Sequence, residues 1–250
     1  MPVLATEDLT WRIGGVPIVD GVSLQLEAGE FVGVIGPNGA GKTSLFNLIS
    51  GLNVSGVTST TSGRVQLLGT DVTGLAPHRR ARLGLGRTFQ SSSVFGSLSV
   101  RENVALAAQA RSGGSGSLWR KASGYTKADE CLSTVGLSLR RDAKAGTLAH
   151  GEKRKLEIAL LLAGDPKVLL LDEPMAGVAT EDIPGLIEVI RRVLSAESRS
   201  ILMVEHHMDV ILELADRLAV MHHGSLLAVG TPDEVMANRA VQEAYLGEAL

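Results

Sequence analysis

Hydrophobic and polar positions alternate along the first part of the chain in a pattern that predicts strands. Residues 3 to 13 and 16 to 26 alternate loosely on either side of a Gly-Gly pair, which predicts a β-hairpin with a glycine turn. Residues 31 to 35, FVGVI, form a short apolar run that is typical of a buried strand. A glycine-rich loop follows, and the next apolar residues lie at helical spacing: Leu45, Leu48 and Ile49. The sequence therefore predicts a strand, a loop and a helix in that order.

The second half of the chain repeats this order of strand and helix. Residues 167 to 174, KVLLLDEP, and 200 to 207, SILMVEHH, each contain an apolar run typical of a buried strand. After the first run, these apolar residues share one helical face: Ile183, Leu186, Ile187, Ile190 and Leu194. After the second run, the helical pattern consists of Val210, Ile211 and Leu214. Strands that alternate with helices predict an α/β core with a mainly parallel sheet.

The end of the chain carries signals for a second hairpin and a capped helix. Residues 217 to 230, RLAVMHHGSLLAVG, predict a hairpin with a turn at the central glycine. The sequence Thr231-Pro232-Asp233-Glu234 then predicts a helix that starts with a capping box and has proline at its first position.

Between about residues 91 and 147 the signals for buried strands vanish and helical patterns replace them. We therefore expect one domain over residues 1 to 250, with a core formed by about 1 to 90 and 148 to 250. The intervening segment is expected to be an inserted helical subdomain. Within it, residues 112 to 117, SGGSGS, have the composition of a flexible surface loop.

The composition limits the possible partners and the compartment. The 24 basic and 27 acidic residues give a net charge of -3, so no general attraction to nucleic acid is expected. The single cysteine, Cys131, excludes an internal disulfide framework and fits a reducing compartment such as the cytoplasm. The densest apolar run falls far short of the roughly 18 residues that suggest a membrane span. Any association with a membrane is therefore expected to come through a partner.

The clearest chemical motif is the sequence GPNGAGKTS, which matches a phosphate-binding loop. The backbone N–H groups of such a loop surround an anion at a helix N-terminus, and a side chain at a glycine position would hold the phosphates away. Lys42 supplies a charge for the β- and γ-phosphates, and Thr43 offers a hydroxyl to Mg²⁺. The expected nucleotide-binding residues are Gly36, Pro37, Asn38, Gly39, Ala40, Gly41, Lys42, Thr43 and Ser44.

A second motif, VLLLDE, places two carboxylates at the end of a buried strand. Asp172 is expected to bind in the Mg²⁺ shell, and the adjacent Glu173 to orient or deprotonate the attacking water. Together with the phosphate loop, the motif predicts hydrolysis of a nucleoside triphosphate.

Three further stretches complete an ordered set of motifs. One is LAHGEKRKLE, residues 148 to 157, a polar stretch in which Gly151 begins a helix and leaves its N-terminus open to an anion. The others are Gln90 in GRTFQ and His206 in VEHHMD. With the phosphate loop and VLLLDE, these motifs resemble the nucleotide-binding subunit of ATP-binding-cassette transporters over nearly the whole chain. The resemblance implies a RecA-like P-loop NTPase core with an N-terminal antiparallel β subdomain.

The family resemblance also implies a mechanism and partners. Two cassettes hold two ATP molecules in a head-to-tail dimer, in which Gly151 of one chain faces the γ-phosphate on the loop of the other. His150 is grouped with the residues near the nucleotide and is not expected to be a catalyst. Gln90 is expected to contact Mg²⁺ or the attacking water and to sense a transmembrane partner, and His206 to contact the γ-phosphate. The cofactors are then ATP and Mg²⁺.

Two positions depart from the family pattern. An aromatic residue usually stacks on adenine from the first hairpin, where this chain has Ile13, so Trp11 two residues earlier is the candidate for stacking. Ala179 stands where the family commonly has Asp or Asn, which puts coupling between subunits through that side chain in doubt.

Shorter stretches resemble one branch of the family, the importers of branched-chain amino acids and their relatives for urea and short amides. These stretches are FNLISG, GRTFQ, LSVREN, EHHMDVI and EAYLG. The resemblance implies a peripheral subunit at the cytoplasmic face of the membrane, bound to integral membrane permease subunits and to a second cassette, identical or paralogous. An extracytoplasmic solute-binding protein is an indirect partner. The solute itself stays open.

Two alternatives to a transporter remain. A soluble cassette ATPase that acts as a switch uses the same sandwich, but such proteins usually carry two cassettes in one chain or a long coiled coil, and this chain has neither signal. A regulatory binder without hydrolysis is disfavoured by the presence of Glu173. Metal binding by His207 or by the pair His222 and His223 is disfavoured because no third ligand lies at a useful spacing.

Overall fold

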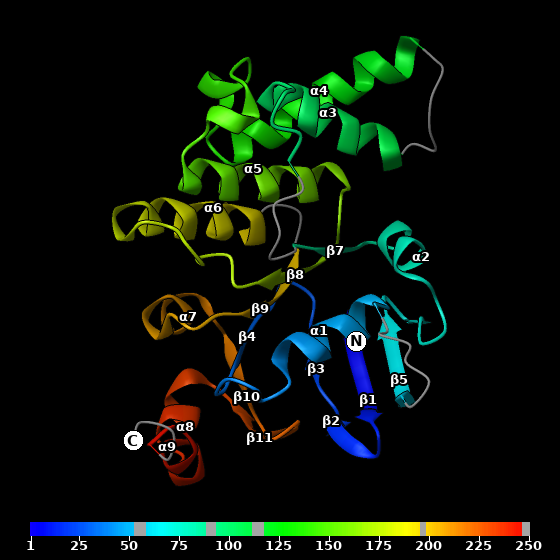
Figure 1. The fold of residues 1–250 in the computed structure, drawn as a ribbon, viewed down its shortest axis with the longest axis vertical. Helices are drawn as coiled ribbons and strands as arrows, with labels where there is room; N and C mark the ends of the chain where they lie inside the picture. Colours follow the sequence, from blue (N-terminus) through cyan, green and yellow to red (C-terminus); the bar gives the residue numbers. More distant parts are fainter. Residues whose placement is uncertain (53–58, 89–93, 112–117, 196–198, 247–250) are drawn as a thin grey trace.

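The computed structural model describes residues 1–52, 59–88, 94–111, 118–195 and 199–246. They form an α/β fold with two sheets, and Figure 1 shows a group of helices at one end of the molecule and the N-terminal sheet toward the other. The predicted fold class is confirmed.

The N-terminal sheet is antiparallel and contains the predicted hairpin. Its strand order is β2-β1-β5-β6. The short β3 pairs with the N-terminal part of β1, on the edge of β1 opposite β5. The strands are β1 (Leu4–Ile13), β2 (Val16–Val22), β3 (Gln25–Leu26), β5 (Ser59–Leu67) and β6 (Thr70–Asp71). The sequence did not predict β5, because its first six residues, STTSGR, include no large apolar side chain. Only Val65 and Leu67, near its end, are apolar and buried. Pairing with β1 therefore determines that strand.

The larger sheet has the order β11-β10-β4-β9-β8-β7. Neighbouring strands from β10 to β7 run parallel, and β11 pairs antiparallel to β10. The strands are β4 (Phe31–Ile35), β7 (Leu85–Arg87), β8 (Val168–Asp172), β9 (Ser200–Val204), β10 (Arg217–His222) and β11 (Ser225–Gly230). Every residue of β4, β8 and β9 is buried, as the apolar runs predicted.

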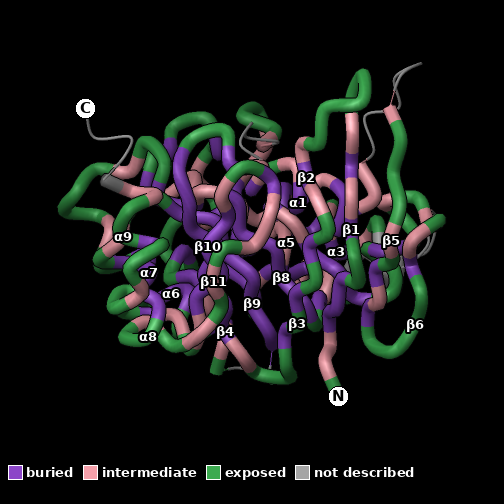
Figure 2. The backbone as a smooth tube through the Cα atoms, turned by 90° about the horizontal axis from the view of Figure 1, so that it is seen from below, coloured by how far each residue is buried: buried purple, intermediate pink, exposed green. Residues whose placement is uncertain are grey.

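Alternate residues of these three strands enter two hydrophobic clusters on opposite faces of the sheet, because side chains of a strand point to alternate faces. On one face lie Phe31, Ile35, Leu169, Leu171, Ile201 and Met203. On the other lie Val32, Val34, Val168, Leu170, Leu202 and Val204. Figure 2 shows these strands as the buried centre of the molecule.

Helices cover both faces of the larger sheet. One face packs against α5 (His150–Ala163), α6 (Ile183–Ser195) and α7 (Met208–Leu214), and α3 (Val100–Arg111) and α4 (Leu118–Thr134) pack on α5 in a further layer. The other packs against the N-terminal sheet and α1 (Lys42–Ser50), whose predicted apolar residues Leu45, Leu48 and Ile49 are buried. The short helix α2 (Pro77–Arg82) lies beside β7 (Figure 1).

The fully buried Arg80 of α2 holds the end of α1. Its guanidinium donates to the carbonyl oxygens of Leu48 (2.8 Å) and Ile49 (2.6 Å), which end α1, and to those of Leu75 and Thr73. The carbonyls of Leu48 and Ile49 lie in the last turn of α1, where few N–H groups are free to bind them, and that of Leu48 also accepts from the Gly51 N–H. The bonds from Arg80 tie the end of α1 to α2.

The segment predicted to be a helical insertion contains α3 and α4, followed by the short 3₁₀ helices η1 (Ser138–Arg140) and η2 (Ala145–Thr147). Its buried residues belong to the same cluster as one face of the sheet, through contacts with α5. The boundaries of the subdomain stay a prediction. Residues 112 to 117 and Gln90 lie outside the described residues.

The C-terminal elements confirm the predicted hairpin and cap. The strands β10 and β11 form an antiparallel hairpin, and α8 (Pro232–Met236) and α9 (Arg239–Leu246) follow. The Thr231 hydroxyl accepts from the Glu234 N–H, and the Glu234 carboxylate accepts from the Thr231 N–H (2.8 Å). In the described part of the chain, no helix is both long enough and apolar enough to cross a membrane.

Candidate active site

The candidate site lies along one edge of the larger sheet, where parallel strands present their carboxyl ends. The phosphate loop follows β4, His206 follows β9, and Glu173 follows β8. Since these strands are neighbours in the sheet, the three segments meet, and they line a depression of about 250 Å³. Its lining residues are Ile18, Asn38, Gly39, Ala40, Gly41, Lys42, Thr43, Ser44, Glu173 and His206.

Backbone geometry explains the glycines at the two ends of the phosphate loop. Gly36 has a φ of 145°, and a Cβ there would lie 2.1 Å from the carbonyl oxygen of Met221. Gly41 has a φ of 97°, and a Cβ there would lie 2.6 Å from the carbonyl oxygen of Ile18. Because other residues would both be strained and collide with backbone, glycine shapes this loop. The loop can then direct its N–H groups at an anion.

The phosphate loop ends at the N-terminus of α1, which begins with Lys42 and Thr43. The Lys42 ammonium is buried and donates to the carbonyl oxygens of Gly36 and Pro37, the latter at 2.8 Å. Thr43 is exposed, and the first turn of α1 contains no acidic residue to compete for an anion. Lys42, Thr43 and the helix N-terminus can therefore together receive phosphate groups.

Glu173 and His206 form a pair beside the loop. Nε2 of His206 lies 3.1 Å from Oε1 of Glu173, and the ring nitrogen donates or accepts according to its tautomer. Glu173 has a φ of 48° and its N–H donates to the carbonyl oxygen of Val204 (2.9 Å). A left-handed conformation is unfavourable for a residue with a Cβ and is often found at functional sites. The geometry thus aims a carboxylate and an imidazole at the space in front of the loop.

A buried carboxylate, Glu205, holds the two loops that carry this pair. It is 3% exposed and accepts from the N–H groups of His206 (2.9 Å), Met175 (3.1 Å) and His207 (3.3 Å). Glu205 was not among the residues predicted from the sequence. The sequence feature that could have revealed it is a charged residue directly after an apolar run, ILMV, as Asp172 follows VLLL.

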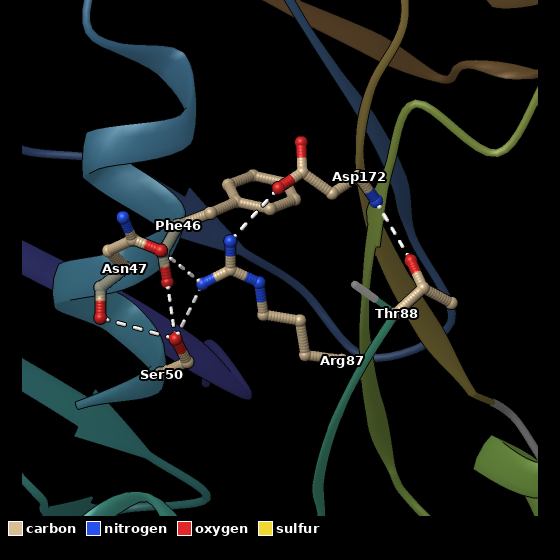
Figure 3. A network of polar contacts seen from close by, with 6 residues as sticks. All are labelled: Phe46, Asn47, Ser50, Arg87, Thr88 and Asp172. Carbon is tan, nitrogen blue, oxygen red and sulfur yellow. Dashed lines mark hydrogen bonds and ion pairs between the residues drawn. The ribbon is translucent and has the colours of Figure 1, made fainter. Parts of the chain in front are cut away.

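Asp172 forms a buried ion pair with Arg87 of β7, shown in Figure 3. Oδ2 accepts from Nη2 of Arg87 (2.9 Å), and the side chains are 2% and 7% exposed. Burial raises the pKa of the Asp172 carboxyl, while the hydrogen bond and charge of Arg87 oppose that change. Burial also lowers the pKa of Arg87, opposed by the same partner. Arg87 could not be identified from the sequence either, because nothing in GRTFQ shows which element faces it.

The other Asp172 oxygen, Oδ1, is buried and has no hydrogen-bond partner among the described residues. The Asp172 N–H donates to the Thr88 hydroxyl (3.0 Å), which fixes the strand end. Carboxylate and hydroxyl oxygens are the ligands that Mg²⁺ prefers, and a buried oxygen without a partner is costly. Asp172 and Thr43 therefore fit a bound Mg²⁺.

Gly151 and His150 lie away from this depression. Gly151 is buried in the first turn of α5, where a Cβ would lie 2.8 Å from a carboxylate oxygen of Asp182. His150 lines a separate hollow of about 370 Å³ with Lys153, Arg154 and Glu157. Among the described residues, neither Gly151 nor His150 lines the depression at the phosphate loop. Their expected contact with nucleotide on another chain stays a prediction.

Trp11 is not placed to stack on a base in this conformation. It is 7% exposed and belongs to the hydrophobic cluster between the N-terminal sheet and the larger sheet. Ile13, at the end of β1, is 41% exposed, and Ile18 of β2 lines the depression instead. The loose alternation of β1 could not reveal this, because the register against β2 shifts on both sides of Trp11.

The fold and the phosphate loop with its two carboxylates define a nucleoside triphosphatase. The model of the ABC transporter family matches residues 19–176, and that of the branched-chain amino acid ATP-binding cassette transporter matches residues 225–250. The high-affinity branched-chain amino acid transport ATP-binding protein BraF of Pseudomonas aeruginosa is 37% identical, over 99% of each chain. Its counterpart LivG of Escherichia coli is 35% identical, also over 99% of each.

Solved structures agree with these relatives. An ATP-binding cassette of an ABC transporter in its ADP conformation has a TM-score of 0.84, with 30% identity over 99% of this chain and 100% of that one. A nucleotide-free cassette has a TM-score of 0.83, with 31% identity and the same coverage. The chain belongs to the ABC transporter family. Within that family it is an ATP-binding subunit that hydrolyses ATP.

Proposed function

We propose that this chain energises an importer of branched-chain amino acids or of a related small polar solute, such as urea or a short amide. The observation that carries the proposal is the depression in which the phosphate loop, Glu173 and His206 meet, in a chain that matches the branched-chain amino acid cassette over its C-terminal residues. The branched-chain amino acid transport relatives, matched over almost their whole length, support the choice of solute class.

The site residues have distinct roles in this proposal. The loop N–H groups and Lys42 bind the β- and γ-phosphates, so the Lys42 ammonium exchanges its contacts with Gly36 and Pro37 for phosphate oxygens. Glu173 orients the attacking water and takes its proton, and His206 turns from Glu173 toward the γ-phosphate. Thr43, Asp172 and Gln90 would hold Mg²⁺, which when bound offsets the charge on the β- and γ-oxygens.

A second cassette, identical or paralogous, completes the site with its own Gly151. The separation of Gly151 from the loop of its own chain supports this arrangement. Closure of the two cassettes on ATP moves the helical subdomain, residues 91 to 147, relative to the core.

Permease subunits anchor the chain at the cytoplasmic face of the membrane. An apolar groove of about 320 Å³ between α2, β7 and α5 fits a cytoplasmic helix of such a subunit, since Leu85, Leu160 and Leu161 line it. The groove also includes Arg87, three residues before Gln90, so a helix there would lie beside the start of the segment that senses it. The solute-binding protein outside the membrane has no contact with this chain.

The first test is to solubilise native membranes, capture the tagged chain and identify the copurifying proteins by mass spectrometry. Multi-span membrane proteins, with or without a second cassette, are the expected result. The solute receptor that belongs to the same transporter is then assayed for binding of leucine, isoleucine and urea. Recovery of soluble partners alone would overturn the transporter and leave an ATP-driven soluble switch.

A further inference from the structure

Arg87 connects two elements that carry the proposed magnesium ligands. Its Nη2 donates to Asp172 Oδ2 on β8, and its Nη1 donates to Asn47 Oδ1 and Ser50 Oγ on α1, both at 2.8 Å (Figure 3). The guanidinium also lies 5.8 Å from the centroid of the Phe46 ring. One side chain on a third element, β7, thus bridges the helix after the phosphate loop and the strand that ends in Asp172.

This bridge acts on the site through the stiffness of α1. The helix has nine residues, and Asn47 and Ser50 lie one to two turns after Thr43. A short helix moves as one body, so a contact at its second half also fixes its first turn. The contacts of Arg87 therefore set the position of the Thr43 hydroxyl relative to the Asp172 carboxylate.

The ion pair also orients Asp172. Arg87 occupies Oδ2, and Oδ1 is left buried without a hydrogen bond among the residues described. A bound cation would satisfy that oxygen. An arginine suits this task because its planar fork offers separate nitrogens to Asp172 and to α1, whereas lysine offers one.

We propose that Arg87 is a positioning residue for the magnesium site: it aligns Asp172 with Thr43 by bridging β8 and α1. The proposal rests on the proposed function, in which both residues bind Mg²⁺. Loss of a partner that orients a metal ligand typically lowers metal affinity by about 10- to 100-fold.

The test measures binding of a fluorescent ATP analogue while Mg²⁺ is titrated from excess chelator to saturation. All proteins carry Glu173→Gln, so that the analogue is not hydrolysed. In Arg87→Met we expect the Mg²⁺ concentration at half-maximal effect to rise by about tenfold or more, with affinity in chelator unchanged. Arg87→Lys keeps the charge but not the bridge, so it is expected to restore only part of the affinity for Mg²⁺.

Arg80→Met is the matched control. Arg80 is also buried and also contacts α1, through the carbonyl oxygens of Leu48 and Ile49, but among the described residues its hydrogen bonds do not include one to Asp172. Its replacement loosens α1 from α2 but leaves the link from α1 through Arg87 to Asp172 in place. We therefore expect lower stability and an unchanged Mg²⁺ midpoint of the folded protein. A shift as large as that of Arg87→Met would show that loosening α1 alone is sufficient and would overturn the specific role of Arg87.

A second variant keeps the test valid if Arg87→Met does not fold. Asn47→Ala with Ser50→Ala removes the contacts of Arg87 to α1 and leaves the ion pair with Asp172. We expect a smaller rise in the Mg²⁺ midpoint. Unchanged midpoints in the folded variants would overturn the proposal about Arg87. If instead the Glu173→Gln parent and its Asp172→Asn derivative respond equally to Mg²⁺, the proposed magnesium site itself is wrong.

Discussion

The proposed catalytic chemistry depends on single residues whose side chains extend from strand ends. Glu173 and His206 lie on different loops, and the buried Glu205 accepts hydrogen bonds from both loops. This support keeps the carboxylate near its working position before any ligand is bound. The free energy needed to hold Glu173 and His206 in place is therefore supplied when the protein folds, not when ATP binds.

Glu173→Gln is expected to lower the ATPase kcat by about 100-fold or more, because the amide cannot accept the proton of the attacking water. ATP affinity is expected to stay within about twofold, since the amide keeps the size of the side chain. Phosphate release and equilibrium binding measure the two effects. The control is Glu181→Gln, an exposed carboxylate in the nearby 3₁₀ helix η3 (Thr180–Asp182), and full activity of Glu173→Gln would contradict the role of Glu173.

Sequence alone predicted those site residues that local pattern marks. Lys42, Thr43, Asp172 and Glu173 follow apolar runs in motifs whose chemistry depends on neighbours along the chain. Glu205 and Arg87 escaped detection because their roles depend on partners distant in sequence, such as Asp172, which is 85 residues from Arg87. The burial of Trp11 was also not predicted, because burial by a second sheet cannot be inferred from one strand.

At the scale of elements, the phosphate loop and the N-terminus of α5 show how backbone geometry is fixed. In α5 the Glu152 carboxylate accepts from the Ala149 N–H (3.1 Å) and pairs with Arg140 (3.0 Å). In the loop, Gly36 and Gly41 allow the chain to approach other backbone closely. The contacts of Glu152 fix the N-terminus of α5, and the two glycines shape the loop that leads into the N-terminus of α1.

Gly41→Ala is expected to lower the free energy of unfolding more than Gly39→Ala. Both glycines have a positive φ, which costs roughly 1–2 kcal/mol for a residue with a Cβ. A Cβ at Gly39 would meet open space, whereas one at Gly41 would lie 2.6 Å from the Ile18 carbonyl oxygen. Urea denaturation of the two variants compares these costs, and equal losses would contradict the backbone collision.

Glu152→Gln is expected to reduce the loss of stability in acid. Burial raises the pKa of Glu152, but the hydrogen bond from Arg140 and the Ala149 N–H lower it more, so the pKa lies below 4.5. The resulting stabilisation is present above the ordinary pKa and is lost as the pH falls through the lower value in the folded state. Because the pair is partly exposed, the effect is below about 1 kcal/mol. Urea denaturation at several pH values across this range gives the free energy of unfolding of each protein. If that free energy fell equally with pH in wild type and variant, the prediction would be contradicted.

At the scale of the whole molecule, one sheet with two covered faces organises the fold. The apolar runs of β4, β8 and β9 predicted this sheet, because strands buried on both faces have nearly continuous apolar sequences. The polar strand β5 and the short β7 could not be predicted, since pairing with β1 and β8 determines them. The sheet order then brings the phosphate loop and both carboxylates to one edge.

We expect ATP to convert the Glu173→Gln protein from monomer to dimer, because a site split between two chains closes when hydrolysis cannot reopen it. Light scattering with and without ATP measures the change, for the chain alone and with its permease subunits. Glu173→Gln with Lys42→Ala is the control and is expected to stay monomeric. Absence of an ATP-dependent dimer in both settings would contradict the sandwich arrangement.

The left-handed backbone of Glu173 sets stability against activity at one position. Asn or Gly would adopt a φ of 48° at lower cost than Glu, so either replacement would relieve strain at the end of β8. Either would also remove the carboxylate. Selection for a more stable fold alone would therefore remove the proposed catalytic carboxylate. In that proposal the strained backbone at the end of β8 is a loss of stability that serves turnover rather than nucleotide binding.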